Sequence, residues 1–580
     1  MPSLAVHPRL LATCLLVLAA GGAALAQTQS ASPNPGRLYD VRAFGATGDG
    51  KTLDTDAINR TIAAAAGAGG GTVEFPPGTY LSFTIQLKSH VWLHLNPGSV
   101  IEAAKEAPGF GHYDEAEPNR SATTDIGGSF HNSLIAGDSL EDIAITGPGV
   151  IYGKGLPRAN GAGGGTAGGT GRGPARAPDF SGPPLPPAAP LPASVGFSSP
   201  GRGGNKSIGL VNCHNVLLRD FWVRQGGWSA VDVLGADNLT IENVKVDTNR
   251  DGFDIDCCRN VRISDCMVNA MNDDGICLKS PDALGAPRAC ENITITGCEV
   301  SGYDTGTFFD GTYKHDQAVA PDRDGPTGRI KFGTGSAGGF KNITISNCVF
   351  DRSRGLALEA VDGGTIENVT ITNIAMRNVS NAAIFLRVGN RARGPAGSPV
   401  GTIRGVSISH IVASEVDGRF PIIIAGVPGH PVEDVRLSDI RLESRGGFSL
   451  DDAAKQPASL VNRFFLRAAG LADPRDPYLP PEQEAAYPEP SMFGILPAWG
   501  IYVRHAKDLA FRDIKLSFEK NDTRPVIVLD DVAGVEFKNV KAQRAGGAPF
   551  FVLRKVADFS VGDSSGVPDR QLPTAEQESL

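Results

Sequence analysis

Three aspartates stand where acid–base chemistry is possible. Asp251 lies in the segment 249–254, and the pair Asp273 and Asp274 lies in the segment 272–280, about one repeat unit further along. Carboxylates one coil apart in a coiled β-structure come to lie side by side, and two neighbouring carboxylates are what acid–base cleavage of a glycosidic bond requires. The spacing therefore predicts a polysaccharide-cleaving enzyme.

The elements that would position these aspartates are copies of a short motif, in which a turn-forming residue is followed by alternating apolar residues. Copies begin at Asn215, Asn238, Asn260, Asn292, Asn342, Asn368, Gly405, Asp434, Asp508 and Gly534. Alternation places the second, fourth and seventh positions of each copy inside. Copies stacked at roughly one coil each, with loops where the gaps widen, predict an all-β solenoid.

The seventh position of the copies forms a single apolar stack. It is occupied by Phe221, Val244, Cys266, Cys298, Cys348, Ile374, Ile411, Ile440, Ile514 and Val540. No Cys-x-x-Cys or histidine-paired spacing accompanies the three cysteines, so they fit a buried ladder better than a metal site. Four asparagines also open Asn-x-Thr sequons and are expected to turn the chain: Asn238, Asn292, Asn342 and Asn368.

The amino terminus and the charge restrict the class of protein. Residues 1–26 have the pattern of a cleavable signal peptide, and residues 27–36 form a polar leader. The mature chain is therefore expected to be secreted or periplasmic. No other apolar stretch is long enough to span a bilayer, and a formal net charge of −9 gives no basic footprint for nucleic acid. We expect no membrane and no nucleic-acid partner, and a monomer.

One β-helix domain is expected over residues 37–565, followed by a C-terminal tail at 566–580. Asp54 or Thr55 would begin a short alanine-rich helix that runs to about Ala66 and seals the open end of the solenoid. Long loops are expected at three places, about 153–204, about 303–326 and about 444–499, and the first of these is rich in glycine and proline.

The two aspartate segments match motifs of a known family. Asn249-Arg250-Asp251-Gly252 follows an Asn-Thr-Asp-Gly pattern with arginine in place of threonine, and residues 272–280 follow a Gly-Asp-Asp motif that runs on into Ile-Lys-Ser. With these motifs the chain resembles glycoside hydrolase family 28, the polygalacturonase-like enzymes of the pectin-lyase-like superfamily. The resemblance covers most of the mature chain and implies a right-handed parallel β-helix.

The resemblance also implies roles for the three aspartates. Asp273 would protonate the leaving oxygen, and Asp251 and Asp274 would activate water on the opposite face, with inversion of configuration. Acidic groups packed together also help to hold a proton on one of them near neutral pH. The substrate would be a pectin-type polysaccharide or oligosaccharide, and neither a cofactor nor a metal ion is expected.

Two further motifs of the family are missing. No histidine stands in register for Gly-His-Gly before Gly333, and Ala357-Leu358-Glu359 replaces Arg-Ile-Lys. In polygalacturonases the arginine and lysine of this motif bind the substrate carboxylate. Glu359 would repel a carboxylate at that position instead of attracting it. Glu359 could instead bind sugar hydroxyls.

Four cations from neighbouring coils are candidates to bind substrate in place of the arginine and lysine of the missing Arg-Ile-Lys motif. They are Lys279, Arg329, Lys331 and Arg387. The inserted loops suggest a closed-off pocket and hence action on chain ends.

Two alternative functions remain open from the sequence. A calcium-dependent polysaccharide lyase on the same fold would use a basic residue such as Lys331 or Arg387 beside the acidic cluster. A non-catalytic carbohydrate-binding β-helix would account for the two missing motifs. A lyase leaves unsaturated ends, a hydrolase leaves reducing ends without unsaturation, and a binding protein leaves neither.

Overall fold

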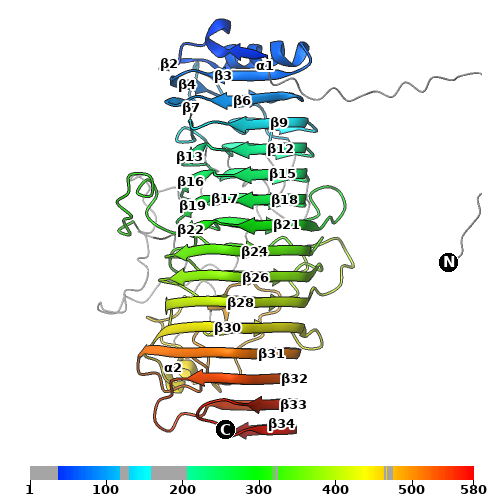
Figure 1. The fold of residues 1–580 in the computed structure, drawn as a ribbon, viewed down its shortest axis with the longest axis vertical. Helices are drawn as coiled ribbons and strands as arrows, with labels where there is room; N and C mark the ends of the chain where they lie inside the picture. The colour runs from blue at the N-terminus through cyan, green and yellow to red at the C-terminus, as the bar shows by residue number, and fades with distance from the viewer. Residues whose placement is uncertain are drawn as a thin grey trace, which may run out of the picture.

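Strands stack in parallel, coil upon coil, along the long axis of the molecule (Figure 1). The computed structural model describes residues 37–117, 130–157, 205–317, 319, 324–462, 466 and 474–580. Each coil contributes strands to three rows of paired strands, which we name the first, second and third sheets. The predicted all-β fold with a parallel β-helix is confirmed.

The three sheets share strands toward the end of the chain. The first sheet contains β1 (Leu38–Asp40), β3 (Gly71–Phe75), β6 (Val91–Leu95), β9 (Glu141–Thr146), β12 (His214–Arg219), β15 (Asp237–Glu242), β18 (Arg259–Ser264), β21 (Cys290–Thr296), β24 (Phe340–Asp351), β26 (Thr365–Arg377), β28 (Thr402–Val416), β30 (Val432–Gly446), β31 (Ile501–Lys520), β32 (Ile527–Ala542), β33 (Phe551–Gly562) and β34 (Arg570–Ser579). The second contains β2 (Asp49–Leu53), β4 (Gly78–Ser82), β7 (Ser99–Ala103), β10 (Val150–Tyr152), β13 (Trp222–Arg224), β16 (Lys245–Thr248), β19 (Met267–Ala270) and β22 (Glu299–Ser301), and then joins β24. The third contains β5 (Ile85–Gln86), β8 (Ile135–Asp138), β11 (Ile208–Val211), β14 (Ser229–Leu234), β17 (Asp251–Asp256), β20 (Ile276–Lys279), β23 (Ile330–Phe332), β25 (Leu356–Ala360), β27 (Ile384–Val388) and β29 (Ile422–Ala425), and then joins β31.

Equivalent apolar residues of successive coils lie directly over one another. In the first sheet Val216 pairs with Leu239, Leu239 with Val261, and Val261 with Ile293. Every residue of the predicted seventh-position stack is buried. Because parallel pairing repeats the same register from coil to coil, the alternation seen in the sequence becomes one continuous core.

The repeated asparagines turn the chain, as expected. Asn238, Asn260 and Asn292 have φ of 61°, 54° and 58°, the left-handed region that asparagine tolerates best among residues with a side chain. The amide of each donates to the side-chain oxygen of its equivalent in the preceding coil, at 3.0, 3.3 and 3.1 Å. These positions therefore form a ladder that runs along the edge of the stack.

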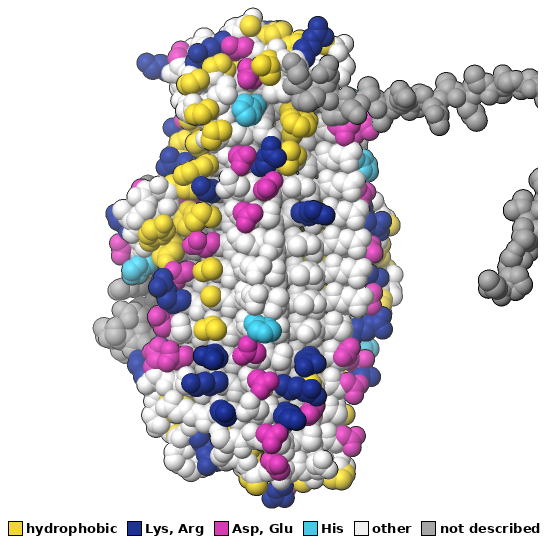
Figure 2. All heavy atoms as spheres, in the orientation of Figure 1, with side chains coloured by type: hydrophobic (Ala, Val, Ile, Leu, Met, Phe, Trp, Pro, Cys, Tyr) yellow, Lys and Arg dark blue, Asp and Glu magenta, His cyan; other side chains and the backbone are white. Residues whose placement is uncertain are grey.

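The middle of the first sheet presents few charged side chains on its outer face. Figure 2 shows that face in the orientation of Figure 1, and uncharged polar side chains and backbone dominate it there. The candidate catalytic aspartates belong to the third sheet instead.

A helix closes the amino-terminal end of the stack (Figure 1). The predicted helix is α1 (Thr55–Gly67), which follows the short 3-10 helix η1 (Val41–Phe44) and buries Ile58 and Ile62 together with smaller residues. Asp54 precedes α1, but its carboxylate does not cap it. The carboxylate instead accepts from the backbone N–H groups of Thr47 and Gly48, at 2.7 and 3.0 Å, and so holds the entry loop against the helix.

The prediction of a C-terminal tail at 566–580 is wrong for most of that segment. Residues 570–579 form β34, which pairs antiparallel with β33. The segment is polar and lacks the alternation of a half-buried strand, because most of its side chains are exposed and its backbone bonds supply the pairing. The pattern of side chains therefore gave no signal for this strand.

Two of the expected loops lie largely within the described residues. No strand is assigned to the described residues between β22 and β23. The segment between β30 and β31 contains α2 (Leu450–Lys455) and the 3-10 helix η2 (Pro490–Phe493). The signal peptide, the leader and residues 158–204 of the glycine- and proline-rich loop lie outside the described residues.

Eight cysteines are described, and all of them are buried and free. Cys266, Cys298 and Cys348 form the expected internal ladder. The neighbours Cys257 and Cys258 point into different apolar clusters. Neither α-helix in the described part of the chain has the length and apolar character needed to cross a bilayer.

Candidate active site

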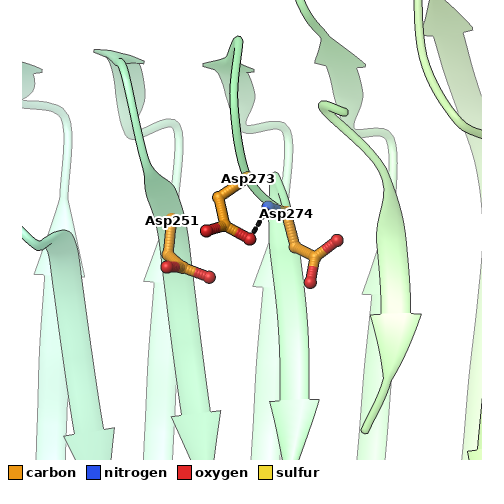
Figure 3. Close-up of side chains that lie close together, drawn as sticks. All are labelled: Asp251, Asp273 and Asp274. Carbon is orange, nitrogen blue, oxygen red and sulfur yellow. Dashed lines mark hydrogen bonds between the residues drawn. The ribbon is translucent and has the colours of Figure 1, made fainter. Parts of the chain in front are cut away.

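The two aspartate segments meet at adjacent coils of the third sheet (Figure 3). Asp251 opens β17, and Asp273 and Asp274 occupy the turn that leads into β20. The backbone N–H of Gly252 donates to the carbonyl of Asp274 at 3.0 Å, and this bond fixes one coil against the next. One carboxylate oxygen from each aspartate lies within 4.8 Å of the others. The structure thus brings together the three residues that the sequence singled out.

The three carboxyl groups are shielded but reachable. Asp251, Asp273 and Asp274 are 6%, 9% and 3% exposed. Asp273 also accepts from the backbone N–H of Asp274 at 3.2 Å, which orients its carboxylate toward the middle of the cluster (Figure 3). Removal from water strengthens the interactions among these charges.

Each aspartate of the cluster faces a cation. Lys279 Nζ lies 3.8 Å from Asp251 Oδ1, and Arg250 Nη2 lies 2.8 Å from Asp273 Oδ2. Asp274 receives Arg329 Nε at 2.7 Å and faces Lys331 Nζ at 3.3 Å. Four side-chain cations thus surround three carboxylates, so much of the charge that would attract a metal cation is already balanced.

The environments of Asp251 and Asp274 drive their pKa values apart. Burial, with the nearby charges of Asp254 and Asp273, raises the pKa of Asp251 well above its ordinary value. Burial also acts to raise the pKa of Asp274, but the charges of Lys331 and Arg329 outweigh it and leave that pKa below its ordinary value. Two carboxyl groups with opposed protonation preferences are the pattern of an acid and a base.

Lys279 is enclosed rather than offered to solvent. Its ammonium contacts the carboxylate of Asp254, and its side chain is 13% exposed. Burial acts to lower the pKa of Lys279, but Asp254 and Asp251 raise it well above the ordinary value, so the residue stays charged. This predicted substrate-binding residue therefore lies where it can orient Asp251.

Arg329 and Lys331 lie beside Asp274, but the inserted loop covers both. Arg329 precedes β23 and Lys331 lies within it, and they are 2% and 1% exposed. The Arg329 guanidinium donates to Glu489 at 2.6 and 3.2 Å, and Lys331 donates to the Tyr487 hydroxyl at 3.1 Å. The structure thus places these two predicted substrate-binding cations beneath the inserted loop.

Glu359 and Arg387 are enclosed further along the same sheet. Glu359 in β25 is fully buried, 3.6 Å from Lys331, and burial raises its pKa to about 7. Arg387 in β27 is 1% exposed and donates to the carbonyls of Gly426 and Glu482, both at 2.7 Å. Neither side chain lies open to a ligand in this arrangement.

Sequence reasoning missed several side chains of the site. Arg250 stacks over the ring of Trp228, with its guanidinium carbon 4.1 Å from the ring centroid. The replacement of threonine by arginine in the first motif was the signal that could have drawn attention to it. No local pattern could have placed Glu489 beside Arg329, because 160 residues separate them.

Family models match two parts of the chain. Residues 38–138 match the model described as rhamnogalacturonase A/epimerase, pectate lyase-like, and residues 201–315 match that of a right-handed β-helix region. A probable polygalacturonase from Vitis vinifera is 23% identical over 431 residues, which are 69% of this chain and 73% of that protein. The chain is similar to the polygalacturonase-like enzymes of glycoside hydrolase family 28. The predicted resemblance and the predicted enzyme class, a glycoside hydrolase, are thereby confirmed.

Solved structures agree on the fold of this polygalacturonase-like chain. The family 28 exopolygalacturonase of Yersinia enterocolitica has a TM-score of 0.55 at 18% identity and covers 86% of this chain and 78% of its own. An exopolygalacturonase of Thermotoga maritima has a TM-score of 0.52 at 20% identity, over 71% of this chain and 88% of its own. At these identities they establish the fold, and the right-handed β-helix is confirmed.

Proposed function

We propose that this glycoside hydrolase cleaves a pectic glycan by general acid–base catalysis at Asp251, Asp273 and Asp274. The observation that carries the proposal is the juxtaposition of three carboxyl groups from two adjacent coils, two of them with opposed pKa shifts. Such a set can hold one proton and one negative charge at the same time near neutral pH.

In this proposal the three aspartates divide the work. Asp273 donates the proton to the leaving glycosidic oxygen, and Asp274, kept ionised by Arg329 and Lys331, activates the attacking water. Asp251, whose pKa is raised, keeps a proton in the cluster and lies close enough to pass that proton to Asp273. Lys279 positions Asp251 through its contacts with both Asp251 and Asp254.

Inversion of configuration remains part of the proposal and follows from the family. Inverting enzymes usually place their carboxyl groups about 6.5–9.5 Å apart, so that water fits between them. The nearest oxygens here lie within 4.8 Å. The anomer formed first in the reaction, followed by NMR, is therefore the measurement that decides the stereochemistry.

The proposed enzyme acts at chain ends and outside the cytoplasm. The inserted loop between β30 and β31 covers the coils beyond Asp274, which supports action at chain ends. The signal-like residues 1–26 support export to the periplasm or the medium.

A calcium-dependent lyase is the second candidate, because oxygens of three carboxylates lie close enough together to hold a metal ion. The four surrounding cations argue against it, since a divalent ion would add to positive charge already in contact with the same oxygens. Product analysis on a panel of pectic polymers, with calcium and separately with chelator, separates the two. Saturated reducing ends formed in chelator support the hydrolase, whereas unsaturated products that require calcium support the lyase.

Replacing Asp273 tests the proposed acid. Asp273→Asn should lower kcat by about 10²–10⁴-fold, because a general acid typically contributes that much. Asp265→Asn is the matched control, since Asp265 occupies an exposed turn at φ 55°, which asparagine also tolerates. A folded Asp273→Asn protein with nearly normal turnover would refute the assignment.

A further inference from the structure

The inserted loop places a carboxylate on the cations beside Asp274. Glu489 comes immediately before η2 and is 1% exposed. Its Oε1 lies 2.6 Å from Arg329 Nη2 and 3.2 Å from Arg354 Nη1, and its Oε2 accepts from Arg329 Nη1 at 3.2 Å. The paired contact with Arg329 is the one that a guanidinium makes with a bound carboxylate.

Every side-chain nitrogen of Arg329 and Lys331, the two cations beside Asp274, faces an acceptor of the protein. Arg329 directs Nε to Asp274 and both terminal nitrogens to Glu489. The ammonium of Lys331 has three donors and three neighbours, which are the Tyr487 hydroxyl, Asp274 and Glu359 at 3.1, 3.3 and 3.6 Å. A carboxylate from outside would have to compete with these partners.

The inserted loop between β30 and β31 is also held in place because its displacement would be energetically unfavourable. Arg329 and Arg354 are both 2% exposed, and removal of Glu489 would leave two buried guanidinium groups without this counter-charge. Buried charges that lose their partner are strongly unfavourable. The closed arrangement is therefore the stable one, and the surface next to Asp274 is formed by the loop rather than by free cations.

We propose that Glu489 occupies the position of a substrate carboxylate at Arg329, so that the sugar bound on the Asp274 side of the cluster is neutral rather than a uronic acid. This inference rests on the proposed function and narrows its substrate class. The enzyme would cleave a pectic glycan at a bond where one of the two joined sugars is uncharged. A uronate on that side would find no uncompensated positive charge, because Asp274, Glu359 and Glu489 already pair with Arg329, Lys331 and Arg354.

Hydrolysis of two kinds of purified oligosaccharide tests the inference. One kind contains uronic acid throughout, and the other alternates uronic acid with a neutral sugar. The wild type should favour the alternating chain in kcat/KM by at least about tenfold, because unmatched charges in a closed site reject the wrong ligand. Glu489→Gln keeps the shape of the side chain but removes its charge, and should reduce that preference by about tenfold.

Two variants keep the test interpretable. Glu484→Gln changes a carboxylate of the same loop that has no contact with Arg329 among the described residues, and should leave the preference unchanged. Tyr487→Phe frees a donor of Lys331 while Glu489 remains, so it should shift the preference in the same direction by less. It replaces Glu489→Gln if that protein does not fold.

A binding measurement separates this inference from the proposed function. By calorimetry, Glu489→Gln should bind an oligogalacturonate about tenfold more tightly than the wild type does. That result without hydrolysis of either glycan would refute the proposed activity but support the neutral subsite. Equal binding, or a wild type that cleaves the all-uronate chain at least as well as the alternating one, would overturn the inference.

Discussion

Arg250 is the side chain that most directly links charge to chemistry at the site. It is 34% exposed, lies 2.8 Å from Asp273 and 4.0 Å from Asp251, and rests on Trp228. A cation at this place favours the ionised form of the neighbouring carboxyl groups, and its charge partly opposes the rise in the pKa of Asp251 that burial produces.

Arg250→Gln should therefore move the basic limb of the pH profile upward. Without the cation, the pKa of Asp251 rises further, so the cluster keeps its proton to higher pH. The pH dependence of kcat/KM measures this, and Arg250→Lys should keep the wild-type limb because the charge remains. A limb that stays in place or moves to lower pH would contradict the expectation.

The sequence predicted which three aspartates form the cluster and that they lie close together in space. The repeat placed Asp251 one coil before Asp273 and Asp274, and parallel pairing turned that spacing into proximity. The environment of Glu359 could not be predicted in the same way. Its neighbours come from other coils and a distant loop, and only three-dimensional packing shows that it is buried.

The inserted loop between β30 and β31 is anchored through a histidine. His505 Nε2 lies 3.1 Å from Glu482 Oε1, within that loop, and His505 Nδ1 lies 2.6 Å from Asp531 Oδ2. Burial acts to lower the pKa of His505, but the hydrogen bonds to Glu482 and Asp531 raise it above the ordinary value. Glu482 precedes Tyr487 and Glu489 in the same segment, so this anchor supports the cover of the site.

The stability that this anchor contributes should fall as pH rises. A raised pKa in the folded state means that the stabilisation is complete below the ordinary histidine pKa of about 6.5, and is lost as pH rises through the folded value. His505→Gln should lower the melting temperature at pH 5 but much less at pH 9. The difference should correspond to about 1 kcal/mol or less, because water screens the exposed Asp531.

The comparison of melting temperatures at the two pH values measures the effect. Asp531→Asn should reduce the pH dependence in part, because Glu482 keeps its contact with the histidine. A larger loss of stability at pH 9 than at pH 5 would show that the histidine acts in another way.

At the scale of elements, the alternating motif predicted the strands well and the irregular segments less well. α1 begins at Thr55 and ends at Gly67, close to the predicted bounds. The cover formed by residues 487–489 was not predictable, because loop contacts depend on where the ends of the loop are fixed. Tyr487 of this cover accepts a hydrogen bond from Lys331 Nζ.

The whole molecule is a stack in which each coil contacts its neighbours, so stability and chemistry can be separated along its length. Near the carboxyl end, the rings of Phe511 and Phe537 stack at 4.6 Å, and Phe551 and Phe559 pack around them. The three candidate catalytic aspartates lie several coils away, in β17 and in the turn before β20.

Phe537→Ala should destabilise the carboxyl-terminal coils without altering catalysis. Loss of a buried phenylalanine side chain typically costs about 3–5 kcal/mol. Thermal unfolding should therefore begin at lower temperature, while kcat/KM measured well below that temperature stays at the wild-type value. Phe253→Ala, an inward-facing change on β17 itself, should impair both properties. Equal loss of activity in the two variants would mean that coils communicate over the whole stack.

The antiparallel strand β34 affects how the end of the stack can associate with other molecules. A column of parallel coils ends in a row of unpaired backbone N–H and C=O groups, which is a template for another copy of the same column. β34 pairs with that row in the reverse direction, and its outer edge carries Pro573 and the charges of Glu576 and Glu578. Proline and charge are the features that discourage edge-to-edge pairing. The sequence segment with the least regular pattern thus opposes fibre formation, in a fold whose repetition would otherwise favour it.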